Sequence, residues 1–141
     1  MSKVIDCFKG EYHWLSNFHS CPVHHEGLTF KNTEAAFQAS KTLNMDEREK
    51  FVGINPLIAK RMGRRVKLRT DWESVKIVVM RNVLRCKFSQ NPELKAKLIA
   101  TGDSKLEEGN NHGDRIWGTV NGKGQNHLGK LLMEIRAELM N

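Results

Sequence analysis

The sequence predicts a mainly helical α+β fold. Segments with helical spacing of apolar residues dominate from residue 33 onward, whereas the clearest short β-prone segments lie before that point. The chain has 141 residues, of which 39% are hydrophobic and 28% charged, an ordinary globular balance. Because it contains no repeat, low-complexity tract or linker, we expect a single domain over residues 1–141.

The predicted β element is small and lies near the N-terminus. The segment VIDCF (residues 4–8) is short and β-prone. The segment CPVHHEGLTF (residues 21–30) predicts a hairpin that turns at Glu26-Gly27.

Helices account for most of the remaining chain. We expect them from Thr33 to about Asn44, around Asp46–Val52, from Pro56 to Gly63, over residues 72–88, from Asn91-Pro92 to Gly102, and from Asn126 toward the C-terminus. The segment VKIVV within residues 72–88 is β-branched and leaves a buried strand as an alternative, but the length of the apolar pattern favours a helix.

The ends of these helices carry recognisable residues. Asn55 and Asp71 are suited to N-caps, Pro56 to a first helical position, and Gly63 to a helix end. The last helix has one apolar face, formed by Leu128, Leu131, Leu132, Ile135 and Leu139.

Composition narrows the classes of function. The formal net charge of +7 favours anionic partners, such as nucleotides, phosphosugars or nucleic acid. The longest uncharged apolar run, Ile77–Met80, is too short to cross a bilayer, and the N-terminus does not resemble a signal peptide. Three widely spaced cysteines suit free thiols in a reducing compartment. We therefore expect a cytoplasmic protein.

Three polar residues recur at helical spacing in NTEAAFQASK (residues 32–41). Glu34, Gln38 and Lys41 stand at i, i+4 and i+7, which predicts one stripe on a helix whose other side carries small alanines. The stripe either faces water or lines a site. A solvated face is the simpler interpretation, because an acid is favoured at a helix N-terminus in any case.

A glycine-rich segment, residues 109–130, leads into the last helix. Such a loop can expose backbone N–H groups to phosphate at the helix start. Trp117 could stack on a base, Asp114 could bind ribose hydroxyls or act at the reacting centre, and Arg115 could pair with phosphate. The segment matches no nucleotide-binding fingerprint, and a turn-rich connection with Trp117 in the core explains it equally well.

A basic segment, AKRMGRRVKLRT (residues 59–70), lies earlier in the chain. Its charges are Lys60, Arg61, Arg64, Arg65, Lys67 and Arg69. It predicts a nucleic-acid patch, an anchor for a diphosphate, or simply a solvated surface, and it lacks the interleaved aromatics of single-strand binding. Cys21, His24 and His25 are the tightest group of metal-ligand types, but no second ligand pair accompanies them at zinc spacing. We expect neither a metal nor another cofactor.

Seven segments occur in the order typical of the NADAR, or YbiA-like, family, which this sequence resembles from about Phe8 to the C-terminus. They are WLSNF (14–18), TEAAFQASK (33–41), NPLIAKRMGR (55–64), DW (71–72), VMRNVLRCKFSQNPELKAKLIATGD (79–103), DRIWG (114–118) and NHLGKLLMEIR (126–136). The resemblance implies a compact, mainly helical α+β domain. It also implies an N-glycosidase, which cleaves the bond between a base nitrogen and ribose C1 in phosphoribosylated riboflavin precursors or in ADP-ribosylated guanine.

The resemblance implies site residues as well. The family's acid, glutamine and lysine in the first conserved helix fall on Glu34, Gln38 and Lys41. Its D-R-x-W-G motif falls on Asp114, Arg115, Trp117 and Gly118, and its N-x-L-G motif on Asn126, Leu128 and Gly129. Ala35 and Phe37 stand where members usually have His and Tyr.

Cleavage of an N-glycoside builds positive charge on ribose, so a carboxylate near C1 is needed. Glu34 and Asp114 are the candidate carboxylates, and Lys41 offers an amine that could capture the opened sugar aldehyde as an imine. The candidates for substrate binding are Trp14, Asn17, Gln38, Lys60, Arg64, Arg115, Trp117, Gly118, Asn126 and Gly129.

Three functions fit this reasoning. The first is hydrolysis of a riboflavin-pathway phosphoribosyl-aminopyrimidine, the second is removal of ADP-ribose from guanine in nucleic acid, and the third is ADP-ribose or nucleic-acid binding without turnover. We expect a small phosphoribosyl or ADP-ribosyl substrate, with modified nucleic acid as the alternative, and neither a membrane nor an obligate protein partner.

Overall fold

The computed structural model describes residues 3–141 and confirms a mainly helical α+β fold with small sheets. Contacts group the chain into two compact units. The central unit comprises Asn17–Asn91, and the terminal unit comprises the described residues up to Ser16 together with Pro92–Asn141. A single domain over residues 1–141 stays a prediction.

The central unit begins with the predicted hairpin. Strand β2 (Val23–His25) pairs antiparallel with β3 (Leu28–Phe30), with Val23 opposite Phe30. Glu26 and Gly27 connect the strands with φ values of 49° and 87°. Positive φ at both positions gives the turn the twist that a two-residue hairpin needs.

Helix α1 (Thr33–Ala39) is shorter than predicted. Asn32 caps its start, since its side-chain oxygen accepts the Ala35 N–H at 2.7 Å. The helix ends at Ala39 rather than near Asn44, because Ser40 and Thr42 turn their hydroxyls to local hydrogen bonds and Asn44 caps the next helix instead. Short polar side chains of this kind compete with continued helix.

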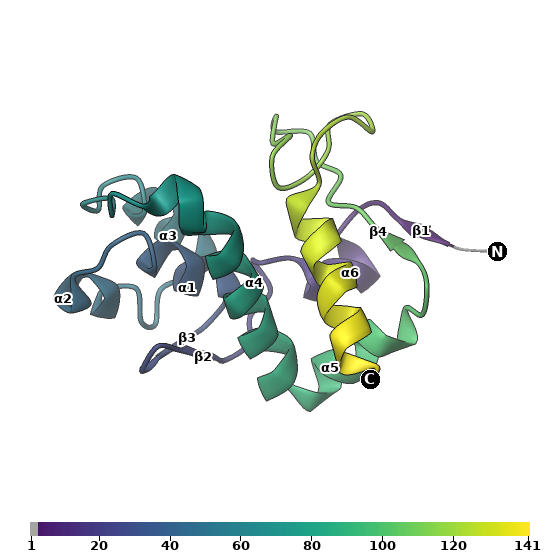
Figure 1. Ribbon diagram of the computed structural model, residues 1–141, viewed down its shortest axis with the longest axis horizontal. Helices are drawn as coiled ribbons and strands as arrows, with labels where there is room; N and C mark the ends of the chain where they lie inside the picture. Colours follow the sequence, from purple (N-terminus) through teal and green to yellow (C-terminus); the bar gives the residue numbers. More distant parts are fainter. Residues whose placement is uncertain (1–2) are drawn as a thin grey trace. The chain divides into compact units, whose positions relative to one another are not determined.

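Two short helices follow. Helix α2 (Met45–Glu49) stops before the predicted Val52, and α3 (Pro56–Met62) has the predicted boundaries. Asn55 caps α3 through a 2.9 Å hydrogen bond from the Ile58 N–H. Within the central unit α1 packs against α3, α4 and the hairpin, as Figure 1 shows.

Helix α4 (Trp72–Gln90) confirms a helix rather than a strand for VKIVV. Asp71 is at the predicted N-cap position of α4, but its side chain makes no cap hydrogen bond. Its carboxylate instead pairs with Arg69 through two hydrogen bonds, of 2.6 and 3.0 Å. The buried face of α4 consists of Trp72, Met80, Val83, Leu84, Lys87 and Phe88.

In the terminal unit, strand β1 (Val4–Ile5) pairs in parallel with β4 (Lys105–Leu106). Only these two residues of the predicted 4–8 segment form strand. The sequence did not predict β4 or the 3-10 helix η1 (Gly10–Leu15). Two-residue strands are too short to show a pattern of alternating side chains.

Helices α5 (Pro92–Ala100) and α6 (His127–Leu139) complete the terminal unit. Helix α6 contacts both β4 and α5, and Figure 1 shows it in yellow. Four of its five predicted core residues are buried, Leu139 being half-buried near the end. Among the described residues, no helix has the length and apolar character needed to span a bilayer.

Candidate active site

Glu34 lies in the first turn of α1, and Asn17 holds that turn. The Glu34 N–H donates to the Asn17 carbonyl oxygen at 3.1 Å, and the Thr33 hydroxyl donates to Asn17 Oδ1 at 3.0 Å. Asn17 is itself 8% exposed, and its amide donates to the sulfur of Met80. Asn17 therefore orients the start of α1 from inside the central unit rather than from the surface.

Gln38 is hydrogen-bonded to Glu34 one turn earlier. Its Nε2 donates to Glu34 Oε2 at 2.6 Å, and the whole Gln38 residue is only 5% exposed. Its other amide atom, Oε1, is buried without a hydrogen-bond partner in the described structure. A buried acceptor without a hydrogen bond lowers the stability of the folded protein. Its presence at Gln38 indicates that the amide is kept in this orientation for another reason.

Lys41 lies two residues beyond the end of α1. The prediction that all three polar residues share one stripe of a helix was therefore wrong for Lys41. Burial lowers the pKa of the Lys41 amine, Glu34 raises it, and Arg64 and Lys60 lower it further. Glu34, Arg64 and Lys60 therefore each lie within electrostatic range of the Lys41 amine. Burial and the two cations thus favour the neutral amine, and Glu34 opposes them.

The solvated-face interpretation of Glu34, Gln38 and Lys41 is wrong. Gln38 is buried, while Glu34 and Lys41 are both half-buried. Helix α1 is covered on nearly every side, since its three alanines are at most 1% exposed and Phe37 packs on Trp72 at 5.1 Å between ring centroids. The arrangement is therefore a polar cluster partly enclosed by protein.

The basic segment divides into three sets of side chains. Lys60 and Arg64 act on Lys41. Arg69 has a structural role: its guanidinium pairs with Asp71, and its backbone N–H donates to the Lys41 carbonyl oxygen at 2.8 Å, which fixes the turn that holds Lys41. The remaining three, Arg61, Arg65 and Lys67, are exposed.

The DRIWG segment lies in a tightly hydrogen-bonded loop of the terminal unit. Asp114 Oδ1 accepts the N–H groups of Ile116 and Trp117 at 3.0 and 2.9 Å. Asn110 organises the loop, because its amide donates to the carbonyl of Asp114 at 2.8 Å and of Thr119 at 3.1 Å. The sequence reasoning missed Asn110, whose only signal was an asparagine pair in a glycine-rich stretch.

The expectation that the start of α6 exposes N–H groups to phosphate was wrong. The N–H groups of Gln125, Asn126, His127 and Leu128 donate to the carbonyls of Arg115, Gly118, Ile116 and Trp117, respectively. The loop thus caps the helix with its own backbone.

Asn126 does not cap α6 through its side chain, although it precedes the helix. Its backbone is left-handed, with φ of 52°. Its Oδ1 accepts the Glu108 N–H and its Nδ2 donates to the Leu106 carbonyl, both at 3.0 Å. The buried amide therefore ties the loop to β4.

Gly118 and Gly129 have structural reasons to be glycine. A Cβ on Gly118 would overlap the Glu108 carbonyl oxygen, and one on Gly129 would overlap that of Leu106. Trp117 is half-buried, with its ring 6.1 Å from that of His127 in an edge-on arrangement, so it is not a full core residue. Arg115 is exposed.

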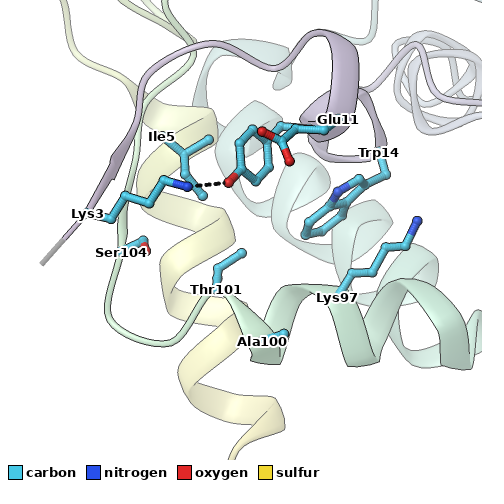
Figure 2. Close-up of a pocket in the computed structure, with 9 residues that line it drawn as sticks. Lys3, Ile5, Glu11, Trp14, Lys97, Ala100, Thr101 and Ser104 are labelled. Carbon is cyan, nitrogen blue, oxygen red and sulfur yellow. Dashed lines mark hydrogen bonds between the residues drawn. The ribbon is translucent and has the colours of Figure 1, made fainter.

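Trp14 is 7% exposed and lines an open cavity of about 330 Å³ within the terminal unit. Figure 2 shows its indole projecting from η1 toward α5, where Lys97 on the helix and Thr101 directly after it form part of the same wall. Two other lining residues are hydrogen-bonded to each other, because the Lys3 ammonium donates to the Tyr12 hydroxyl at 2.7 Å. Trp14 therefore shares this cavity with residues that no part of the sequence reasoning had singled out.

The residues considered for a metal have other roles. His24 Nδ1 lies 2.9 Å from the Thr29 hydroxyl within the hairpin, and Cys21 is buried. Over residues 3–141, no three His, Cys, Asp or Glu side chains are grouped so that they could hold a metal ion.

Sequence comparison places this chain among known proteins. Residues 7–140 match the NADAR domain family. The chain is 47% identical to the N-glycosidase YbiA of Escherichia coli strain K12, over 92% of this chain and 82% of that protein. It is also 36% identical to a riboflavin biosynthesis protein of Vibrio vulnificus and 38% identical to riboflavin biosynthesis protein PYRR of Zea mays. Each of these two matches covers 89% of this chain but only 35% and 23% of the relative.

The fold agrees with that relationship. The NMR structure of the E. coli protein YbiA superposes with a TM-score of 0.88 at 42% identity, over 99% of this chain and 87% of that one. The resemblance seen in the sequence motifs is therefore confirmed, and this chain belongs to the NADAR domain family as a close homologue of N-glycosidase YbiA.

Proposed function

We propose that this chain hydrolyses the bond between a base nitrogen and ribose C1 in a small phosphorylated ribosyl compound of the phosphoribosyl-aminopyrimidine type. The enzyme class follows from homology: a chain this similar to N-glycosidase YbiA is an N-glycosidase, a hydrolase of N-glycosyl bonds. The riboflavin biosynthesis proteins among its relatives support the riboflavin-pathway part of the proposal.

The observation that carries the proposal is the partly enclosed cluster of Glu34, Gln38 and Lys41. As the base leaves with the electron pair of the glycosidic bond, positive charge develops at C1 and the ring oxygen of ribose. A half-buried carboxylate stabilises that charge more strongly than one in open water, because the local dielectric is lower. Glu34 is such a carboxylate, and Gln38 holds it in one orientation.

Lys41 supports a second chemical role. As the C1–N bond breaks and the base leaves with the bonding electron pair and a proton, a neutral amine can bind C1 in its place; opening of the ribose ring then gives an imine, which water hydrolyses to free the sugar and the amine. The lowered pKa of Lys41 increases the neutral fraction that this route requires. Lys60 and Arg64, close enough to act on Lys41, supply positive charge for a substrate phosphate.

In the terminal unit we propose Asp114 as a candidate carboxylate for the reaction. Two N–H groups hold its Oδ1, and its Oδ2 makes no hydrogen bond to the described residues. Arg115 and Trp117 are proposed to bind phosphate and base, respectively, because one is an exposed cation and the other a half-exposed ring. Asn126, Gly118 and Gly129 would act by shaping this loop.

The deciding experiment offers two substrates to the purified protein in parallel. One is a phosphoribosylated aminopyrimidine, and the other is an oligonucleotide that carries ADP-ribosylated guanine. We expect release of free base from the first. Release from the oligonucleotide alone would support the nucleic-acid alternative, which the exposed cations Arg61, Arg65 and Lys67 favour. Binding of either compound without release would support a binding module.

A further inference from the structure

Gly63 directly follows α3 and faces the side chain of Gln38 on α1. A Cβ added to Gly63 would overlap Gln38 Oε1, and it would lie 2.7 Å from Gln38 Cδ and 3.2 Å from Gln38 Cβ. The amide group of Gln38 therefore occupies the space that any larger residue at position 63 would need. Helices α1 and α3 pack together in the central unit, which brings these two residues into contact.

The backbone at Gly63 does not require glycine. Its φ of −60° and ψ of −20° are right-handed helical values that every residue adopts. Glycine at a helix end is usually explained by a left-handed conformation, and that explanation fails here. At a position with compatible angles, replacing glycine by alanine stabilises a protein by about 0.4–1 kcal/mol, because the unfolded chain loses freedom. The requirement for glycine must therefore come from packing against Gln38.

The orientation of the Gln38 amide is set by Glu34. Nε2 must face Glu34 Oε2, since an amide oxygen turned toward a carboxylate would repel it. Oε1 then points away from Glu34 toward Gly63, where it is buried and has no hydrogen-bond partner. The contact with Gly63 is thus the structural consequence of holding Glu34, and it explains why an orphan oxygen is kept inside the unit.

We propose that Gly63 is a positioning residue for N-glycoside hydrolysis. Its missing side chain lets the Gln38 amide adopt the one orientation that donates to Glu34, and this hydrogen bond restrains the carboxylate where it acts. This inference rests on the proposed role of Glu34 in the reaction. With an alanine at position 63, the Gln38 amide must move, the hydrogen bond to Glu34 is lost, and the carboxylate is free to rotate.

The test is a double-mutant cycle with Gly63→Ala and Gln38→Ala, with release of base from a phosphoribosylated aminopyrimidine as the assay. Gly63→Ala should lower kcat by about a hundredfold, the cost of misplacing a reacting group by about an ångström, with KM nearly unchanged. Gln38→Ala should lower kcat to a similar extent. In the Gln38→Ala background, Gly63→Ala should have no further effect, because the two act through one contact.

Thermal unfolding separates positioning from folding. Gly53 provides a matched control in the same unit, since its φ is 78° and a Cβ there would meet no atom within 4 Å. Gly53→Ala should lower the unfolding midpoint through backbone strain and leave kcat unchanged. Gly63→Ala should show the opposite pattern, with a large loss of kcat that its unfolding midpoint does not explain.

Several results would overturn the inference. They are a Gly63→Ala variant with wild-type kcat, an equal loss of kcat when Gln38 is already alanine, or a fully active Gln38→Ala variant. If Gly63→Ala alone fails to fold, Gln38→Ala in the same chain removes the overlap and must restore folding, and Gln38→Ala alone then carries the kinetic test. Glu34→Gln in the same assay separates the proposed role of Glu34 from the inferred role of Gly63. A fully active Glu34→Gln variant would contradict the role of Glu34. An inactive Glu34→Gln variant beside a fully active Gly63→Ala variant would contradict only the role of Gly63.

Discussion

The side-chain amide of Gln38 donates a 2.6 Å hydrogen bond to the carboxylate of Glu34, one helical turn away. We predict that Glu34→Gln keeps the fold, since an amide of the same shape replaces the carboxylate. Base release should fall by at least about a hundredfold, the scale for losing an acid–base group. Glu73→Gln is the control, because Glu73 is an exposed carboxylate on α4 paired only with Lys76 in the described hydrogen-bond network. Normal turnover in Glu34→Gln would remove Glu34 from the mechanism.

The second prediction concerns the imine route. Borohydride added during turnover should reduce an imine between Lys41 and the sugar, which leaves a covalent adduct that mass spectrometry of the digested protein can locate. Lys41→Arg keeps the charge but cannot form the imine, so it should give no adduct and little turnover. An active Lys41→Arg variant without an adduct would leave Lys41 as an anchor for phosphate or hydroxyl groups.

The third prediction uses the charges around Lys41. Arg64 lowers the pKa of the Lys41 amine, so Arg64→Gln should raise that pKa. The neutral amine would then appear only at higher pH, and the acid-side limb of the pH profile of kcat should move upward. Arg65→Gln is the matched control, because Arg65 is exposed and is not among the main charges that act on Lys41. An unchanged limb in Arg64→Gln would show that Lys41 does not titrate in the rate-limiting step.

The fourth prediction separates a small substrate from a nucleic acid. A phosphosugar needs one or two of the cations near Lys41, so KM should depend weakly on salt. A nucleic acid would engage several cations at once, and raising salt from about 50 to 200 mM would weaken binding by orders of magnitude. We expect the shallow dependence. A steep one that disappears when Arg61, Arg65 and Lys67 are neutralised together would assign the substrate to nucleic acid; Arg69 is kept because it holds Asp71.

The fifth prediction concerns Lys87, which is fully buried on α4. Burial lowers the pKa of its amine from 10.5 to about 8, an effect that Cys21 opposes. Between these two pKa values the unfolded chain binds the proton and the folded chain does not. The free energy of unfolding should therefore rise with pH from about 8 to 10.5, by up to about 3 kcal/mol from this group.

Lys87→Met should be more stable than wild type at pH 7 and should lack that rise. Urea denaturation at several pH values measures both effects. Lys95→Met, which removes an exposed lysine, should reproduce the wild-type pH dependence. If Lys87→Met is less stable than wild type at pH 7, the contacts of the ammonium outweigh the cost of burying it.

Local chemistry in the sequence determined much of the fold. Asn55 and Pro56 begin α3 as predicted, and Glu26-Gly27 forms the hairpin turn, because caps and turns depend on residues within a few positions of one another. The motifs also identified the family and the residues Glu34, Gln38 and Lys41, although their roles stay predictions. A motif is a set of residue types in a fixed order, so it can be recognised without coordinates.

Only the tertiary structure decided how these residues are used. Asp71, Asn126 and Gly63 each carry a helix-boundary signal, yet Asp71 pairs with Arg69, Asn126 binds the backbone around β4, and Gly63 accommodates Gln38. The start of α6 likewise gives its N–H groups to a loop rather than to a ligand. A boundary residue can satisfy its local signal or another partner, which lies two residues away for Asp71 but far along the chain for Asn126 and Gly63. Which partner is used depends on which groups the packing of the chain brings into contact. The sequence pattern does not contain these contacts.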